Sequence, residues 1–236
     1  MSLNTALQRY FQGFAGLIFP RYCAACGHAL YMNETILCMG CYAGLPRTGF
    51  HHNPENEVAQ IFWGRVPAEN ATSFMYFAKG SRYRLILHEL KYNGQKQIGS
   101  TMGRMFGSEL KNTPFSTADM IIPVPLHPSK LKTRGYNQSE VIASGISEIL
   151  HLPLETTLIS RIMDTSSQTH KSRYERWENV SCIFKCENPE ALKNKHVLLV
   201  DDVITTGATL EACASCLVPV EGIKISLVSL AFAKLQ

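Results

Sequence analysis

The order of apolar and polar positions alternates between strand-like and helix-like periods over most of the chain beyond residue 71. Short apolar runs bounded by turn residues alternate with segments whose apolar residues recur at helical spacing. The expected strands are 72–78, 119–124, 197–200 and 224–232, and the expected helices are 81–92, 97–111, 137–150 and a helix from about 208 onward. This alternation predicts an α/β fold with a parallel sheet flanked by helices.

The first 71 residues follow a different pattern. Residues 1–20 place apolar side chains on one face of an amphipathic helix, without a basic leading region or a cleavage site. We therefore expect a packing helix, with adsorption to a membrane surface as the less favoured alternative. Residues 49–71 hold two prolines and show no clear periodicity. The expected division is an N-terminal helix with a cysteine module (1–48), a linker (49–71) and an α/β domain (72–236).

Composition places the chain among globular proteins. Of its 236 residues, 45% are hydrophobic and 18% are charged, and no run approaches the roughly 18 uncharged apolar residues of a membrane helix. We therefore expect a cytoplasmic protein without a membrane span. The net charge of +4 does not by itself identify a nucleic-acid partner. Residues 79–111, however, carry seven cations and two acids. A solvated helix face is the favoured interpretation of that cluster, and a phosphate-rich ligand or nucleic acid is the alternative.

Four of the eight cysteines have the spacing of a structural zinc site. Cys23 and Cys26 form one CxxC pair, and Cys38 and Cys41 form a second pair eleven residues further on. Two such turns supply four thiolates for a tetrahedral Zn²⁺ and leave no open position for catalysis. A disulfide framework would need an oxidising compartment, which nothing in the sequence indicates. The other cysteines are interpreted as structural or core residues: Cys182, Cys186, Cys213 and Cys216.

Residues 197–209 are the most informative segment. A buried apolar run, 197–200, is followed by Asp201 and Asp202, and then by a loop of small and hydroxylated residues before a helix. Backbone N–H groups at a helix N-terminus favour a bound phosphate, and paired carboxylates accept hydrogen bonds from ribose hydroxyls. The segment therefore predicts a site for a phosphorylated sugar. Its expected loop residues are Thr205, Thr206, Gly207, Ala208 and Thr209.

Two further polar segments suit a pyrophosphate group. The loop after the strand 119–124 contains Lys130, Arg134 and Gly135, and it leads into a helix that begins near residue 137. A basic loop beside the acid pair is expected to bind pyrophosphate. Residues 164–179 have no apolar face and contain Lys171 and Arg173. A segment of this kind is either disordered or a lid that brings charge to the leaving group.

These motifs together resemble the ComF family of competence proteins, which includes GntX-like members. The motifs are the two cysteine pairs, Leu90-Lys91-Tyr92, 122–126, 134–138, Gln168, Arg173, Arg176, Asn179, Phe184 and 201–209. The resemblance runs from about residue 18 to the C-terminus. It implies a zinc finger joined to a type I phosphoribosyltransferase domain, which binds phosphoribosyl pyrophosphate (PRPP). It also implies a role in DNA uptake, in which the protein handles single-stranded DNA together with other DNA-uptake proteins.

The resemblance assigns roles but no acceptor substrate. Asp201 and Asp202 would bind ribose hydroxyls directly or through Mg²⁺, the 205–209 loop would hold the 5′-phosphate, and Arg134, Lys171 or Arg173 would stabilise the leaving group. A binding protein that retains the fold would instead use the basic segment to hold single-stranded DNA, with Tyr92 and Tyr136 as stacking surfaces. A metabolic transferase that moves ribose 5-phosphate to a nucleobase or amine is the alternative function.

Overall fold

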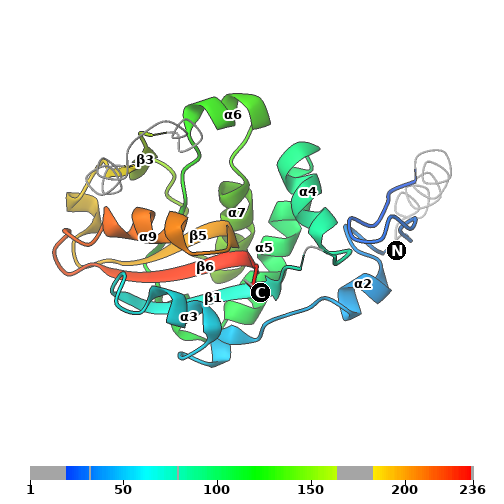
Figure 1. The fold of residues 1–236 in the computed structure, drawn as a ribbon, viewed down its shortest axis with the longest axis horizontal. Helices are drawn as coiled ribbons and strands as arrows, with labels where there is room; N and C mark the ends of the chain where they lie inside the picture. Colours follow the sequence, from blue (N-terminus) through cyan, green and yellow to red (C-terminus); the bar gives the residue numbers. More distant parts are fainter. Residues whose placement is uncertain (1–19, 32, 79, 164–182, 235–236) are drawn as a thin grey trace, which may run out of the picture.

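A four-stranded parallel sheet forms the centre of the molecule. The computed structural model describes residues 20–31, 33–78, 80–163 and 183–234. The sheet has the order β1-β6-β5-β2, and every neighbouring pair runs parallel (Figure 1). Its strands are β1 (Ala68–Tyr76), β2 (Met120–Pro123), β5 (His196–Ile204) and β6 (Lys224–Phe232). A separate antiparallel pair consists of β3 (Ile159–Arg161) and β4 (Phe184–Cys186).

Helices cover both faces of this sheet. On one face lie α5 (Lys96–Leu110) and α7 (Gln138–Leu150), and on the other lie α3 (Glu57–Phe62) and α9 (Ala208–Ser215). The remaining helices are α2 (Met39–Ala43), α4 (Arg84–Tyr92) and α6 (Pro128–Arg134), with single turns η1 (Phe50–His52), η2 (Pro114–Thr117) and η5 (Glu190–Leu192). This three-layer arrangement is the expected α/β fold.

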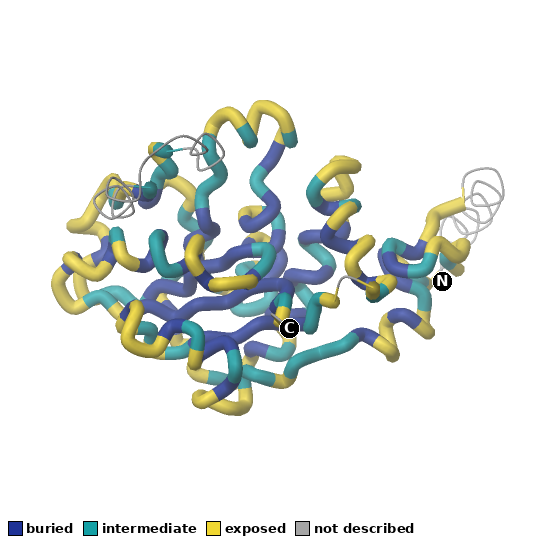
Figure 2. Tube along the Cα trace, in the orientation of Figure 1, coloured by how far each residue is buried: buried dark blue, intermediate teal, exposed yellow. Residues whose placement is uncertain are grey.

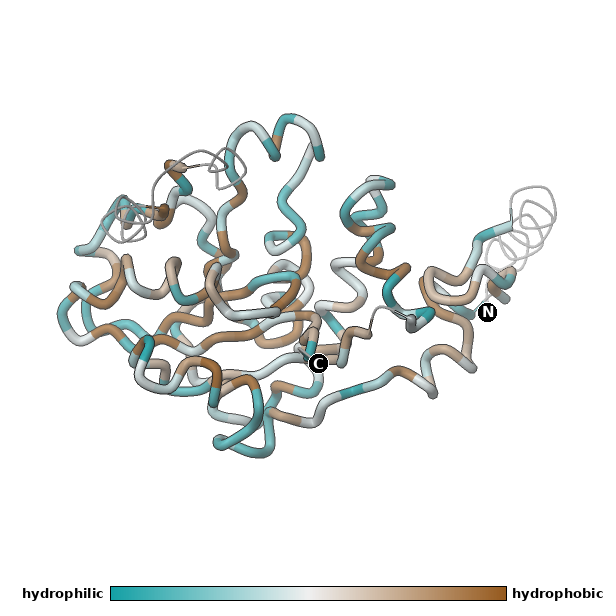
Figure 3. The backbone as a smooth tube through the Cα atoms, in the orientation of Figure 1, coloured by the Kyte–Doolittle hydropathy of each residue, from teal (hydrophilic) through white to brown (hydrophobic). Residues whose placement is uncertain are grey.

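The central position of β5 explains why residues 197–200 are all apolar. Leu198 and Val200 pack into the core beneath α5 and α7, whereas Val197 and Leu199 pack into the core beneath α9. All four side chains are fully buried, and the strands form the dark interior of Figure 2. Burying such a side chain stabilises the fold by about 1.5–3 kcal/mol. Hydropathy follows the same layout, with brown strands inside and teal loops around them (Figure 3).

Helices α5 and α7 approach each other closely through glycine. A Cβ atom added to Gly103 would lie 2.2 Å from the carbonyl oxygen of Ile142, and one added to Gly145 would lie 2.2 Å from that of Ser100. Neither position has room for a side chain, so the two backbones are in direct contact. This contact fixes α7, and the N-terminal end of α7 supplies part of the candidate site described below.

The expected linker contains structured elements. Residues 49–71 include η1, α3 and the first residues of β1, and α3 packs on the sheet through Val58 and Phe62. The buried side chain of Asn56 caps α3, because its Oδ1 accepts the N–H groups of Val58 (2.9 Å) and Ala59 (3.0 Å). The expected basic loop likewise contains the short helix α6. Both helices are too short to show a clear apolar period in the sequence.

The cysteine module packs against the α/β domain. Its buried residues Ile36, Leu37 and Leu45 belong to the same core cluster as Ile86 of α4. The hydroxyl of Tyr83 donates a hydrogen bond to the carbonyl oxygen of Cys41 at 3.2 Å. The expected N-terminal helix (1–20) and the polar segment 164–179 fall outside the described residues apart from Pro20. No helix in the described ranges has the length and apolar character needed to cross a membrane.

Candidate functional site

The two acids lie near the carboxyl end of β5, inside the strand. The sequence suggested that they follow the strand, but β5 continues to Ile204. Asp201 is 8% exposed, and its Oδ1 accepts hydrogen bonds from the hydroxyl of Ser139 (3.0 Å) and from the N–H of Asp202 (2.8 Å). The Oδ2 of Asp202 pairs with the ammonium group of Lys91 at 2.9 Å. Three elements, β5, α7 and α4, therefore meet at the carboxylates.

Burial changes the acidity of this pair. Removal of the Asp201 carboxyl group from water, reinforced by the adjacent charge of Asp202, raises the pKa of Asp201 to about 7. The hydrogen bonds from Asp202 N–H and Ser139, and the charge of Lys91, act in the opposite direction but are weaker. The carboxyl group of Asp201 therefore changes between its protonated and ionised forms near neutral pH. A cation or a hydroxyl donor bound there would favour the ionised form.

The loop after β5 turns at a glycine into the first turn of α9. Gly207, the N-cap of α9, has a φ of 78°, which is a left-handed conformation that favours glycine. The N–H of Ala208 lies 3.4 Å from the Thr206 hydroxyl, at the first turn of α9. A polar cavity of about 30 Å³ is lined by Asp201 and by residues 203–210. Asp201 and the start of α9 thus border one small cavity.

Residues from the expected linker hold this loop in place. Arg65, just after α3, donates a hydrogen bond from Nη1 to the carbonyl oxygen of Thr206 at 2.8 Å, and its other terminal nitrogen pairs with Glu211 of α9. A Cβ atom on Gly207 would lie 2.7 Å from Cγ2 of Ile61. The loop is therefore fixed on its outer side by α3 and the residues that follow it.

The basic segment follows the neighbouring strand. Because β2 pairs in parallel with β5, the chain that leaves β2 starts at the carboxyl ends of the strands, where the acids also lie. Lys130 and Arg134 lie in helix α6, which Gly135 ends with a φ of 77°. Arg134 donates from Nη1 to the side-chain oxygen of Gln138 at 2.9 Å. Lys171 and Arg173, expected to approach the same site, fall outside the described residues.

The four thiols of the cysteine module converge on one point. The sulfur atoms of Cys23, Cys26, Cys38 and Cys41 all lie within 4.8 Å of one another, and those of Cys26 and Cys38 are 3.7 Å apart. A tetrahedral zinc ion with Zn–S bonds of about 2.3 Å requires sulfur atoms about 3.8 Å apart. The arrangement therefore has the donor type, number and spacing to hold zinc.

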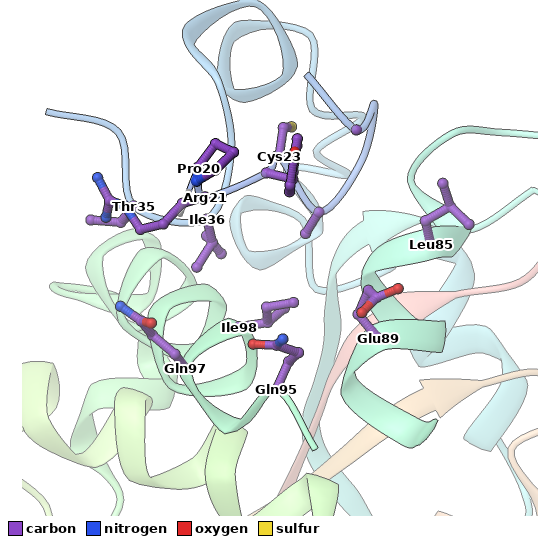
Figure 4. A pocket seen from close by; sticks show the side chains of 13 residues that line it. Pro20, Arg21, Cys23, Thr35, Ile36, Leu85, Glu89, Gln95, Gln97 and Ile98 are labelled. Atoms are coloured by element: carbon purple, nitrogen blue, oxygen red, sulfur yellow. The ribbon is translucent and has the colours of Figure 1, made fainter. Parts of the chain in front are cut away.

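A second cavity is not lined by the acids. It has a volume of about 450 Å³ and separates the cysteine module from α4 and α5, as the close-up in Figure 4 shows. Arg21 and Ile36 line it from the module, and Glu89 and Ile98 line it from the two helices. Its walls combine apolar and polar groups without an arrangement that suggests chemistry, so we place the site at the acids.

Sequence reasoning missed three residues that position the site. Lys91 and Ser139 contact the acids, and Arg65 holds the loop after β5. The Leu90-Lys91-Tyr92 motif pointed to Lys91 in the sequence, but nothing in the sequence indicated that this lysine pairs with Asp202. Tyr136 also differs from expectation. It is 7% exposed and its hydroxyl bonds to the carbonyl oxygen of Leu90, so it presents no stacking surface.

Comparison with known proteins identifies the family. A model of the phosphoribosyl transferase domain matches residues 137–235. The DNA utilization protein YhgH of Escherichia coli O157:H7 is 30% identical over 199 residues, which is 83% of either chain. The chain belongs to the ComF/YhgH family. Two further ComF/YhgH relatives are competence protein F of Haemophilus influenzae and competence protein ComFC of Bacillus subtilis. They are 28% and 29% identical, each over 56% of this chain, and over 60% and 51% of their own lengths.

Proposed function

We propose that this protein binds a 5′-phosphorylated ribose, above all PRPP, and acts in the handling of single-stranded DNA during DNA uptake. The observation that carries the first part is the juxtaposition of Asp201 and the Thr205–Thr209 loop around one polar cavity. The second part rests on the relatives, which are named as DNA utilization and competence proteins. None of these three is named as a metabolic transferase, so DNA handling takes precedence.

Each part of the ligand has a counterpart in the chain. The 205–209 loop and the first turn of α9 would receive the 5′-phosphate through backbone N–H groups. Asp201 and Asp202 would accept the ribose hydroxyls, or hold them through Mg²⁺, for which a carboxylate pair is a suitable ligand set. Lys130, Arg134 and the backbone at Gly135 would receive the pyrophosphate from the neighbouring strand.

The acids must change partners when the ligand binds. Lys91 already neutralises Asp202 at 2.9 Å, so hydroxyls or a metal ion would compete with its ammonium group. If turnover occurs, charge collects on the departing pyrophosphate, where fixed cations lower the barrier. Bound Mg²⁺ would supply further positive charge to the same group. If the protein is also a transferase, this activity is measured as the release of pyrophosphate from PRPP.

Zinc binding by Cys23, Cys26, Cys38 and Cys41 is part of the proposal. The thiol spacing supports it, and four thiolates make the metal structural. Because reduced thiols persist in a reducing compartment, the zinc site also supports a cytoplasmic place of action.

Titration calorimetry with PRPP and Mg²⁺ tests the phosphosugar site. Replacing Thr206 by isoleucine should block the cavity, and PRPP binding should weaken by at least about tenfold because charge-assisted contacts to the phosphate are lost. Thr117→Ile, an exposed threonine beside the opposite ends of the strands, is the matched control and should bind as the wild type does. Wild-type protein that binds no PRPP with Mg²⁺ present would refute the proposal.

Single-strand binding is tested by its dependence on salt. Neutralising several DNA phosphates releases counterions, so affinity for an oligothymidylate should fall steeply between about 50 and 200 mM salt. Lys96→Glu should weaken binding to all sequences alike. Lys91 lies in the same basic segment but is not chosen for this variant, because reversing its charge would also disturb Asp202. If folded, zinc-loaded protein fails to bind the oligothymidylate in low salt, the metabolic alternative is favoured.

A further inference from the structure

Tyr92, the last residue of α4, is an exposed aromatic residue whose ring has two neighbours. The residue is 66% exposed. The ring of His88, one helical turn earlier, lies 5.0 Å away between centroids, and the guanidinium carbon of Arg134 on α6 lies 5.9 Å from the Tyr92 centroid. Within the described ranges, no other aromatic side chain that is more than half exposed has both a neighbouring ring and a cation over it.

The chain around this ring is strongly basic. Residues 84–96 and 128–134, which contain α4 and α6, carry six cations and one acid: Arg84, Lys91, Lys96, Lys130, Lys132, Arg134 and Glu89. Glu89 accepts a hydrogen bond from the side-chain amide of Asn93 at 2.9 Å. Both helices project from the same side of the sheet, at the top of Figure 1. An exposed aromatic ring within a field of cations is suited to a polyanion that also carries flat rings.

Tyr92 also lies next to the phosphosugar site. Its neighbour Lys91 contacts Asp202 at 2.9 Å, and Arg134 belongs to the segment that leaves the strand paired with β5. A chain of nucleotides that crosses between α4 and α6 would therefore pass the edge of the sheet that carries the acids.

We propose that Tyr92, with His88 and Arg134, is a stacking platform for an unpaired base of single-stranded DNA that runs along the edge of the phosphosugar site. This inference rests on the proposed function and specifies where the strand binds. An unpaired base exposes its flat face to the tyrosine ring, whereas a paired base in a duplex does not. The guanidinium group of Arg134 lies over the same ring, so its charge is placed to meet the phosphate next to the stacked base.

The test compares Tyr92→Ala and Tyr92→Phe in binding a short fluorescent oligothymidylate, measured by anisotropy on the full zinc-loaded chain. Tyr92→Ala should weaken binding by about tenfold, since stacking on one aromatic ring typically contributes that much. Tyr92→Phe keeps the ring and should bind within about twofold of the wild type. Trp63→Ala, which removes a similarly exposed ring (61%) just beyond α3, is the matched control and should have no effect.

Further readouts separate this inference from the proposed function. A strand containing 2-aminopurine should change its fluorescence with the wild type and Tyr92→Phe but not with Tyr92→Ala, and duplex DNA should bind more weakly than single strands. Ribose 5-phosphate should bind Tyr92→Ala as it binds the wild type. If the wild type binds single strands and folded Tyr92→Ala binds them equally well, the inference that Tyr92 stacks on a base is wrong, while the proposed function stands. If the wild type binds no single strands, the DNA part of the proposed function fails.

Discussion

Replacing Asp201 by asparagine should stabilise the ligand-free protein, and increasingly so as the pH rises. The carboxyl group of Asp201 is 8% exposed, and its two hydrogen bonds, from Ser139 and from the N–H of Asp202, both go to Oδ1. An asparagine side chain has the same shape and keeps an oxygen at that place, so both hydrogen bonds are retained. The variant therefore removes the buried charge and changes little else.

The magnitude follows from the pKa of Asp201. Its usual value of 3.8 applies to the unfolded chain, and burial raises the pKa to about 7 in the folded protein. Between these two values the unfolded state has lost its proton while the folded state keeps it, so the free energy of unfolding falls as the pH rises. The full difference corresponds to roughly 4 kcal/mol, because one pKa unit is worth about 1.4 kcal/mol. The loss is complete above about pH 7.

The assay is urea denaturation of wild type and Asp201→Asn at pH 5 and pH 8, without added Mg²⁺. The advantage of Asp201→Asn should be larger at pH 8 than at pH 5 by about 2–3 kcal/mol. Asp119→Asn is a control of opposite sign, because the N–H of His196 donates to that exposed carboxylate and lowers its pKa. Asp119→Asn should lower the stability at neutral pH. An Asp201→Asn variant that gains nothing between pH 5 and pH 8 would refute this account of the buried acid.

Three other changes test the scaffold and the metal site. Gly145→Ala should lower the free energy of unfolding by about 1–3 kcal/mol in a thermal or urea melt, because its Cβ would overlap the backbone of α5. A Gly145→Ala variant as stable as the wild type would show that the two helices can move apart without loss of stability. Lys91→Met should lower the free energy of unfolding by about 1–3 kcal/mol, because it leaves Asp202 unpaired, and adding Asp202→Asn should restore most of that free energy. A double variant that is no more stable than Lys91→Met would mean that the pair is not coupled. Metal analysis of protein purified without chelator should give one zinc per chain, and Cys38→Ser should release zinc and expose residues 20–48 to protease; stoichiometric iron would contradict the assignment.

The sequence predicted the elements whose pattern is governed by burial alone. The run 197–200 is buried on both faces, and its uninterrupted apolar character indicated a central parallel strand. Helices α5 and α7 were found from the apolar stripe that each turns toward the core. Helices α3 and α6 were missed because six or seven residues are too few to establish a period. Their local signals were the caps Asn56 and His127, the acid Glu57 in the first turn of α3, and Pro128 and Gly135 at the two ends of α6.

The candidate site could be predicted only in part. Asp201, Asp202 and the glycine at 207 belong to one contiguous motif, so their grouping was visible in the sequence. Lys91 reaches Asp202 from another helix, and no local pattern encodes that pairing. The sequence could not distinguish the exposed Tyr92 from the buried Tyr136 either, since each tyrosine lies within two residues of a basic residue.

The central claim is that the acid pair recognises the sugar while the loop after β5 holds the phosphate. Calorimetric titration of the double variant Asp201→Asn with Asp202→Asn, using PRPP with Mg²⁺ in one series and inorganic phosphate in another, tests it most directly. Losing two charge-assisted contacts should weaken PRPP binding by at least about tenfold. Weak phosphate binding should persist, because the N–H donors of the 205–209 loop remain. A double variant that binds PRPP as tightly as the wild type would show that the acids are structural and would contradict the account.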